Sequence, residues 1–267
     1  MTVADRIRSN PAMTASVALA AATVPAQIAY TLTNGGARDG VTLAVVGLFG
    51  LACLTHAFAV FGLRWAFSYF VITAGIGCAV EILGVATGFP FGSYEYADGR
   101  IGPSIAGVPL VIALAWTAGM YPVWTVAHLL FRRRIAALLA TAVGVLGWDL
   151  YLDPQMVADG QWTWHSPIPG LPGLPDIPVS NYLGWLVVAL LMATVLATVR
   201  TPTVTRASSA VPIALFLWTW LGSALAHAVF LDAPQLHWSA IYGFLVMGVL
   251  GIPLVTRVLA PKKPTVR

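Results

Sequence analysis

Charged residues are scarce in this sequence. Only 9% of its 267 residues are Asp, Glu, Lys or Arg, whereas 58% are hydrophobic. Soluble domains carry about 25% charged residues, so this composition excludes an ordinary soluble protein and indicates a polytopic membrane protein. The net charge of +4 does not indicate nucleic-acid binding, because the basic residues lie between apolar runs.

Cysteine and histidine are also rare, with two and five residues. Cys53 and Cys78 both lie in apolar runs, where we expect buried free thiols and no disulfide framework. The few histidines argue against the dense histidine motifs of a membrane di-iron hydroxylase, and we expect no metal site. No Gly-x-Gly-x-x-Gly follows a strand pattern, which argues against a flavin- or nicotinamide-binding domain. We therefore expect a reaction that needs no cofactor.

Eight apolar runs have about the length that spans a bilayer, roughly 20 residues. The first run follows a short basic segment, as in a signal peptide, but it is longer than the roughly 7–15 apolar residues of such a peptide. We therefore interpret it as a true span. The sequence predicts an all-α membrane helix bundle, in one domain covering residues 1–267, with spans at 12–32, 41–63, 66–87, 106–131, 135–152, 180–199, 211–231 and 238–255.

The basic residues predict the orientation of these spans. With eight spans and the N-terminus inside, only Arg38 and Arg100 of the 14 basic residues fall outside, which leaves 12 inside. Because cytoplasmic loops are enriched in Lys and Arg, we expect a multi-pass protein of the cell membrane with both termini cytoplasmic. The two long loops, 88–105 and 153–179, then lie on the extracytoplasmic side.

Three acids interrupt or end these apolar runs. Glu81 lies within the third span, and Asp149 and Asp153 lie four residues apart at the end of the fifth, a spacing that places both on one helix face. A charge in a spanning helix is costly and by default indicates a functional site. A buried protonated acid can donate a proton while an ionised neighbour accepts one or stabilises a cation. We predict all three as catalytic acid–base groups.

A structural interpretation of the aspartates stays open beside the catalytic one. Asp149 and Asp153 could cap helix ends or bond loop amides, especially Asp153, which precedes Pro154. Aromatic residues near the acids are also open to two interpretations, as the wall of a site where a carbocation forms or as an interfacial aromatic belt. On the first interpretation, substrate contacts come from Phe91, Tyr94, Trp148, Trp162 and Trp164.

Three segments together resemble one family. They read Glu-Ile-Leu-Gly-Val-Ala-Thr-Gly-Phe-Pro-Phe-Gly-Ser-Tyr-Glu-Tyr at 81–96, Gly-Trp-Asp-Leu-Tyr-Leu-Asp-Pro-Gln-Met at 147–156, and Gly-Gln-Trp-Thr-Trp at 160–164 with Pro-Val-Ser-Asn-Tyr-Leu-Gly-Trp at 178–185. This combination resembles the membrane carotenoid 1,2-hydratases, including the bisanhydrobacterioruberin hydratases. The resemblance covers 81–185. It departs at 176–178, where the family often reads Gly-Ile-Pro and this chain reads Asp-Ile-Pro.

The resemblance implies addition of water across the terminal double bond of an acyclic carotenoid, of lycopene type or with a C50 end group. An acid would protonate the alkene, and water would capture the tertiary cation, without a redox cofactor. The residues leave open whether Glu81 or Asp149 is the proton donor. The resemblance adds Asn181 as a substrate-binding residue. The implied partners are the carotenoid, the lipid bilayer and other membrane enzymes of carotenoid synthesis, and not nucleic acid.

Two alternative functions use the same acids. In a membrane prenyltransferase, Asp149-x-x-x-Asp153 would be half of an aspartate-rich diphosphate site. Such a site also needs a second acidic motif, Mg²⁺ and cationic groups, and the outer segments contain almost no Arg or Lys. In a proton-coupled transporter, Glu81 and Asp149 would form a relay. Many transporters contain inverted repeats, and this sequence shows none.

Overall fold

The computed structural model describes residues 10–201 and 203–259. Within these residues, eight helices are long and apolar enough to span a membrane, which confirms the prediction of an all-α polytopic bundle. Six of them are α2 (Pro11–Thr31), α3 (Gly35–Phe61), α4 (Leu63–Thr87), α5 (Leu110–Leu130), α6 (Arg134–Ala158) and α7 (Val179–Leu196).

The last two spans contain π-helical turns. The seventh, Ala210–Phe230, consists of α8 (Ala210–Leu217), the π-helical turn η2 (Trp218–Gly222), α9 (Ser223–Leu225) and the π-helical turn η3 (Ala226–Phe230). The eighth consists of α10 (Leu236–Pro253), which continues into η4 (Leu254–Leu259). A short 3₁₀ turn, η1 (Arg206–Ser208), precedes the seventh span.

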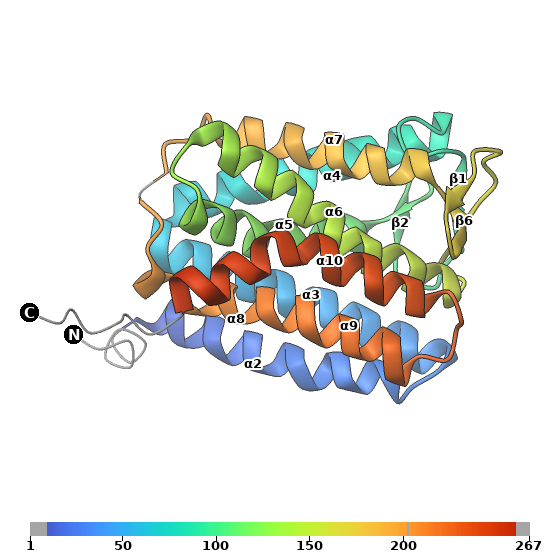
Figure 1. The fold of residues 1–267 in the computed structure, drawn as a ribbon, viewed down its shortest axis with the longest axis horizontal. Coiled ribbons are helices and arrows are strands. Elements are labelled where there is room, and N and C mark those ends of the chain that lie inside the picture. The colour runs from blue at the N-terminus through green and yellow to red at the C-terminus, as the bar shows by residue number, and fades with distance from the viewer. Residues whose placement is uncertain (1–9, 202, 260–267) are drawn as a thin grey trace, which may run out of the picture.

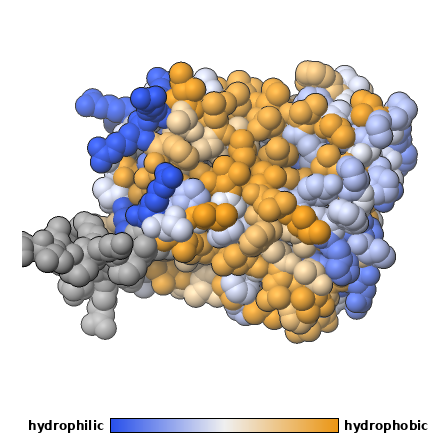
Figure 2. All heavy atoms as spheres, viewed as in Figure 1, coloured by the Kyte–Doolittle hydropathy of each residue, from blue (hydrophilic) through white to orange (hydrophobic). Residues whose placement is uncertain are grey.

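The helices lie side by side along the long axis of the molecule (Figure 1). Hydrophobic side chains cover the middle of the face shown in Figure 2, and hydrophilic residues gather toward the two ends. This distribution suits a bundle whose middle faces lipid. The start of α2 and the end of α10 lie at one end of the bundle, and the labelled strands lie toward the other (Figure 1).

Three short antiparallel pairs of strands form within the two long loops. The first pair brings the loops together, because β1 (Tyr94–Tyr96) comes from one and β4 (Trp162–Trp164) from the other. The remaining pairs are local hairpins, β2 (Ser104–Ile105) with β3 (Val108–Pro109) and β5 (Gly170–Leu171) with β6 (Leu174–Pro178). The β1–β4 ribbon therefore closes one end of the bundle over α4 and α6.

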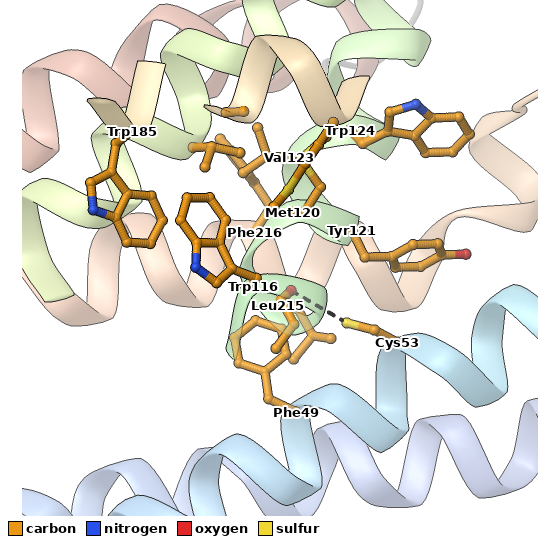
Figure 3. Close-up of a cluster of buried hydrophobic side chains, with 14 of the residues drawn as sticks. Phe49, Cys53, Trp116, Met120, Tyr121, Val123, Trp124, Trp185, Leu215 and Phe216 are labelled. Carbon is orange, nitrogen blue, oxygen red and sulfur yellow. Dashed lines mark hydrogen bonds between the residues drawn. The ribbon is translucent and has the colours of Figure 1, made fainter. Parts of the chain in front are cut away.

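Helix α5 is the central helix of the bundle. In the 18-residue apolar stretch of α5 that could span a membrane, 78% of the residues are buried, against 17% in that of α2. A helix that is hydrophobic all round is expected in such a position. Figure 3 shows Trp116, Met120 and Tyr121 of α5 packed among side chains from neighbouring helices, including Phe216 of α8. Because α5 reaches from the core to the strand-bearing end, it also contributes to the site described below.

A proline interrupts the hydrogen bonding of α5, and a cysteine of α3 compensates for it. Pro122 has no N–H to donate to the carbonyl of Ala118, four residues earlier. The thiol of Cys53 donates to that carbonyl instead, with Sγ 3.7 Å from the oxygen (Figure 3). Both cysteines are free, as predicted, but only Cys53 is fully buried, whereas Cys78 is partly exposed.

The fifth span is longer than the sequence predicted. It was expected to end at 152, but α6 continues to Ala158, so Asp153 and Pro154 lie inside the helix. The side chain of Asp153 is buried and bonds to a side chain of α7, not to a loop amide. The interpretation of Asp153 as a helix cap is therefore wrong. A proline inside a helix interrupts its hydrogen bonding, but contacts with other spans sustain α6 beyond Pro154.

Candidate active site

The β1–β4 ribbon carries four aromatic side chains on its inner face. Its register pairs Tyr94 with Trp164 and Tyr96 with Trp162, and successive side chains of a strand point to opposite faces. The rings of each pair are in contact, with centroids 5.5 Å and 5.4 Å apart. Glu95, between the two tyrosines, is exposed on the outer face. We call this four-ring surface the aromatic roof.

A small cavity of about 20 Å³, which is room for about one water molecule, lies beneath the aromatic roof. Its walls come from α4, α5, α6, α7 and the two long loops. Besides the roof residues, the lining consists of Glu81, Phe91, Ile112, Ala115, Trp116, Leu152, Asp153, Asn181 and Trp185.

Glu81 receives three hydrogen bonds from aromatic side chains. The hydroxyls of Tyr94 and Tyr96 both donate to Oε2, at 2.5 Å and 2.8 Å. The indole N–H of Trp116 donates to Oε1 at 2.9 Å. Glu81 is only 4% exposed; this burial favours its neutral form, whereas the three donors stabilise its ionised form. Burial, and then the charge of Glu81, raise the pKa of both Tyr94 and Tyr96, so the phenols stay protonated and keep donating.

Glycines on α4 allow these donors to approach Glu81. Gly77, Glu81 and Gly84 have helical spacing that places them along one face. A Cβ on Gly77 would lie 2.7 Å from Cδ1 of Trp116, and a Cβ on Gly84 would lie 2.7 Å from the hydroxyl of Tyr94. Both distances are shorter than a van der Waals contact. The two glycines therefore make room for two of the three side chains that bond to Glu81.

The two aspartates of α6 share one amide group from α7. Nδ2 of Asn181 lies 2.5 Å from Oδ2 of Asp153 and 3.4 Å from Oδ2 of Asp149. Asp153 lines the cavity, whereas Asp149, one turn earlier, does not. Asp149 is fully buried, and its Oδ1 has no hydrogen-bond partner among the described residues. Asp153 is therefore the member of the pair that can contact a bound molecule.

The structure brings together most of the residues that the sequence indicated. Glu81, Asp153, Phe91, Tyr94, Trp162, Trp164 and Asn181 all line the cavity. Trp148 lies outside the lining; it packs against Gly119 and meets Trp185 edge-on, with ring centroids 5.7 Å apart. Asp149 also lies behind the wall. Neither residue borders the cavity.

Three further lining residues were not among the predicted substrate contacts: Tyr96, Trp116 and Trp185. Trp116 and Trp185 stack with ring centroids 3.8 Å apart. Tyr96 lies two residues after Tyr94, so strand periodicity would have placed both on one face. Trp185 lies four residues after Asn181, on the same face of α7. Trp116 had no such signal, because α5 is hydrophobic on every side.

No candidate metal site is found in the described part of the chain, where His, Cys, Asp and Glu form no group of three or more suited to a metal ion. His165 is exposed and pairs with Glu95 on the outer face of the ribbon, at 3.1 Å. His227 is buried and bonds to Ser239 and Gln155, away from the cavity lining.

A family model described as "Carotenoid biosynthesis protein" matches residues 41–250, which include every residue lining the cavity. The chain belongs to this family. A bisanhydrobacterioruberin hydratase from Haloarcula japonica is 33% identical over 112 residues, which are 40% of this chain and 36% of that relative. The aligned part is thus little more than a third of the relative's length. No solved structure matches the chain.

In this member of the carotenoid biosynthesis family, the eight spans and the apolar band indicate a multi-pass membrane protein. Its cavity holds two carboxyl groups from different helices, surrounded by aromatic rings. Carboxyl groups in such surroundings can donate and accept protons, and aromatic faces attract cations. The arrangement therefore has the groups needed for proton transfer to an apolar molecule and for stabilising a cation formed from it.

Proposed function

We propose that this protein adds water across the terminal double bond of an acyclic carotenoid in the cell membrane, with both termini cytoplasmic. The proposal rests on one observation above all, the convergence of Glu81 and Asp153 with six Tyr and Trp rings on one cavity. Family membership and the hydratase name of the Haloarcula japonica relative support it. The substrate is of lycopene type or has a C50 end group, supplied within the bilayer by other carotenoid-pathway enzymes.

Asp153 is the proposed proton donor. Two carboxylates bound to the same amide in an apolar bundle would repel each other, so Asp149 and Asp153 hold one proton between them. Asp153 faces the cavity and gives this proton to the less substituted carbon of the terminal double bond. The π electrons form the new C–H bond, which leaves a tertiary cation on the other carbon. Both aspartates are then ionised, and the amide of Asn181, which donates to both, stabilises their charge beside the cation.

Glu81 stabilises the cation and receives the second proton. Its carboxylate faces the cavity, and its three donors orient it. The rings of Trp162, Trp164 and Trp185 add cation–π attraction. Water attacks the tertiary carbon, and the oxonium proton passes to Glu81, giving a tertiary alcohol. Transfer of that proton back to Asp153 through water resets the site, and the sum is alkene plus water with no oxidation.

The substrate enters the cavity by one end group. The cavity of about 20 Å³ has room for about one water molecule, so lining side chains must move to admit that end group. The rest of the polyene must extend out of the cavity. Hydration at the two ends of one molecule would then require two separate binding events.

The prenyltransferase alternative is less compatible with this site. A diphosphate needs cationic groups, and the residues of the described chain that line the cavity include no Lys or Arg. Arg38 and Arg100, the basic residues expected on the same side, are paired with Asp159 and Asp39, the latter pair at 2.7 Å. Asp149, half of the proposed Asp-x-x-x-Asp motif, is outside the lining. No observation favours a transporter.

Expression in two hosts, one that accumulates lycopene and one that accumulates an acyclic C50 carotenoid, tests the proposal. Membranes that contain the protein should accumulate hydrated pigment, detected by chromatography and mass spectrometry. The purified protein should work without oxygen, and its product should carry label from H₂¹⁸O and none from ¹⁸O₂. Label from ¹⁸O₂ would make the protein a hydroxylase, and inserted protein with no hydrated product from either substrate type would refute the proposal.

A further inference from the structure

Pro154 leaves a gap in the hydrogen bonding of α6 directly beside Asp153. A proline inside a helix has no N–H for the carbonyl four residues earlier, which here is that of Leu150. Leu150 is 4% exposed, and in an apolar bundle a polar group without a partner is costly. The carbonyl therefore needs a donor from outside α6.

Ser239 of α10 supplies that donor. Its hydroxyl donates to the carbonyl oxygen of Leu150 at 2.6 Å. The imidazole of His227, in η3, continues the connection, with Nδ1 2.9 Å from Oγ of Ser239 and Nε2 2.9 Å from Oε1 of Gln155. Ser239 and His227 are both fully buried. We call Ser239, His227 and Gln155 the proline brace.

The proline brace connects to α6 on both sides of the gap. Leu150 lies before Pro154 and Gln155 lies directly after it, so Asp153 lies between the two attachments. Tyr151 adds a further link, because its hydroxyl donates to the carbonyl of Trp220 in η2 at 3.0 Å. Both links reach π-helical turns of the seventh span, a type of turn often found at functional sites.

We propose that the proline brace is a positioning device, in which Ser239 and His227 hold the Asp149–Asp153 segment of α6 at the geometry that the cavity requires. Without it, α6 would bend at Pro154 and the carboxyl of Asp153 would move relative to Asn181. The catalytic consequence rests on the proposed hydration, whereas the compensation for Pro154 does not. In the described part of the chain, the hydrogen bonds and ring contact that Ser239 and His227 make with α6 go to Leu150, Gln155 and Tyr151, none of which lines the cavity, so they act through α6.

A double-mutant cycle tests the compensation. Ser239→Ala removes the donor to Leu150, and Pro154→Ala restores a backbone N–H that can reach the same carbonyl. Ser239→Ala should therefore lower the Tm in detergent when residue 154 is proline and change it much less in the Pro154→Ala background. Contacts in one network are expected to show such non-additivity. Equal losses in both backgrounds would overturn the proposal.

Ser16→Ala is the matched control. The hydroxyl of Ser16, also fully buried, donates to the carbonyl of Ala52 on a neighbouring helix at 2.8 Å. His56, four residues after Ala52, has a backbone N–H that can donate to the same carbonyl. The carbonyl of Ala52 therefore keeps its helical hydrogen bond when the hydroxyl of Ser16 is removed. Ser16→Ala should lower the Tm less than Ser239→Ala. A loss as large as that of Ser239→Ala would show that the proline has no special role.

Kinetics test the positioning role. Displacement of a catalytic group by about 1 Å can cost about 10²-fold in rate, so His227→Ala should lower kcat at least about tenfold with little change in KM. His227→Asn retains a polar group near the position of Nδ1 and should recover part of the loss. An unchanged kcat for His227→Ala would overturn the positioning role.

If the stability cycle shows coupling but the native protein hydrates no carotenoid, the proposed function fails and the compensation for Pro154 stands.

Discussion

Replacing Glu81 by glutamine removes the charge of the cavity and preserves its shape. Trp116 donates to Oε1 and can only donate, so the amide oxygen must take that position. The amide NH₂ then replaces Oε2 and faces the hydroxyls of Tyr94 and Tyr96, which can rotate and accept. The hydrogen bonds survive in number. We therefore expect Glu81→Gln to fold and insert normally, with its defect confined to catalysis.

The expected defect follows from the lost attraction between carboxylate and cation. At an effective dielectric constant of about 20, unit charges about 4 Å apart attract by about 4 kcal/mol. Since about 1.36 kcal/mol corresponds to a tenfold change in rate, Glu81→Gln should lower the hydration rate about 10³-fold. The loss of Glu81 as proton acceptor acts in the same direction.

The assay compares hydrated with unhydrated pigment in membranes normalised for the amount of inserted protein. Glu95→Gln is the matched control: it makes the same substitution between Tyr94 and Tyr96, but on the outer face of the ribbon, where the Glu95 side chain is 71% exposed. It should leave the pigment ratio unchanged. A Glu81→Gln protein with more than a tenth of the native rate would refute the role of Glu81 as charge and proton acceptor.

Three further outcomes are expected. Asp153→Asn should abolish hydration more completely than Asp149→Asn, because only Asp153 lines the cavity; the reverse order in the pigment assay would make Asp149 the donor. Gly84→Ala should displace Tyr94 from Glu81 and reduce the hydration rate about 10- to 100-fold, which corresponds to the free energy of one charge-assisted hydrogen bond. A native hydration rate in this variant would show that the contact is dispensable. A single cysteine replacing Arg133 should react with an impermeant reagent only from the cytoplasm, and one replacing Asp98 or Gly170, in the two long loops, only from outside. Labelling of all three positions from one side would exclude the eight-span orientation.

Apolar run length was sufficient to predict the eight spans and the bundle, because a bilayer requires about 20 apolar residues per helix. The cost of charge in such surroundings also singled out Glu81, Asp149 and Asp153 as unusual. The ends of the spans were predicted less well. The fifth span was predicted to end at 152, but α6 continues to Ala158, where donors from other spans support it, and such donors are far away in sequence.

Only the tertiary structure decided how the acids are arranged. The pairing of β1 with β4 joins residues that are 66 to 70 positions apart in the sequence and sets two tyrosines over Glu81. Nothing in the periodicity of α5 distinguishes Trp116 from its other buried aromatics, yet only the helix packing against Gly77 brings this indole to Glu81. Likewise, Asp149 and Asp153 share a helix face, but the cavity reaches only Asp153. Local spacing determines which side chains share a face of one element, whereas contacts between elements determine what that face meets.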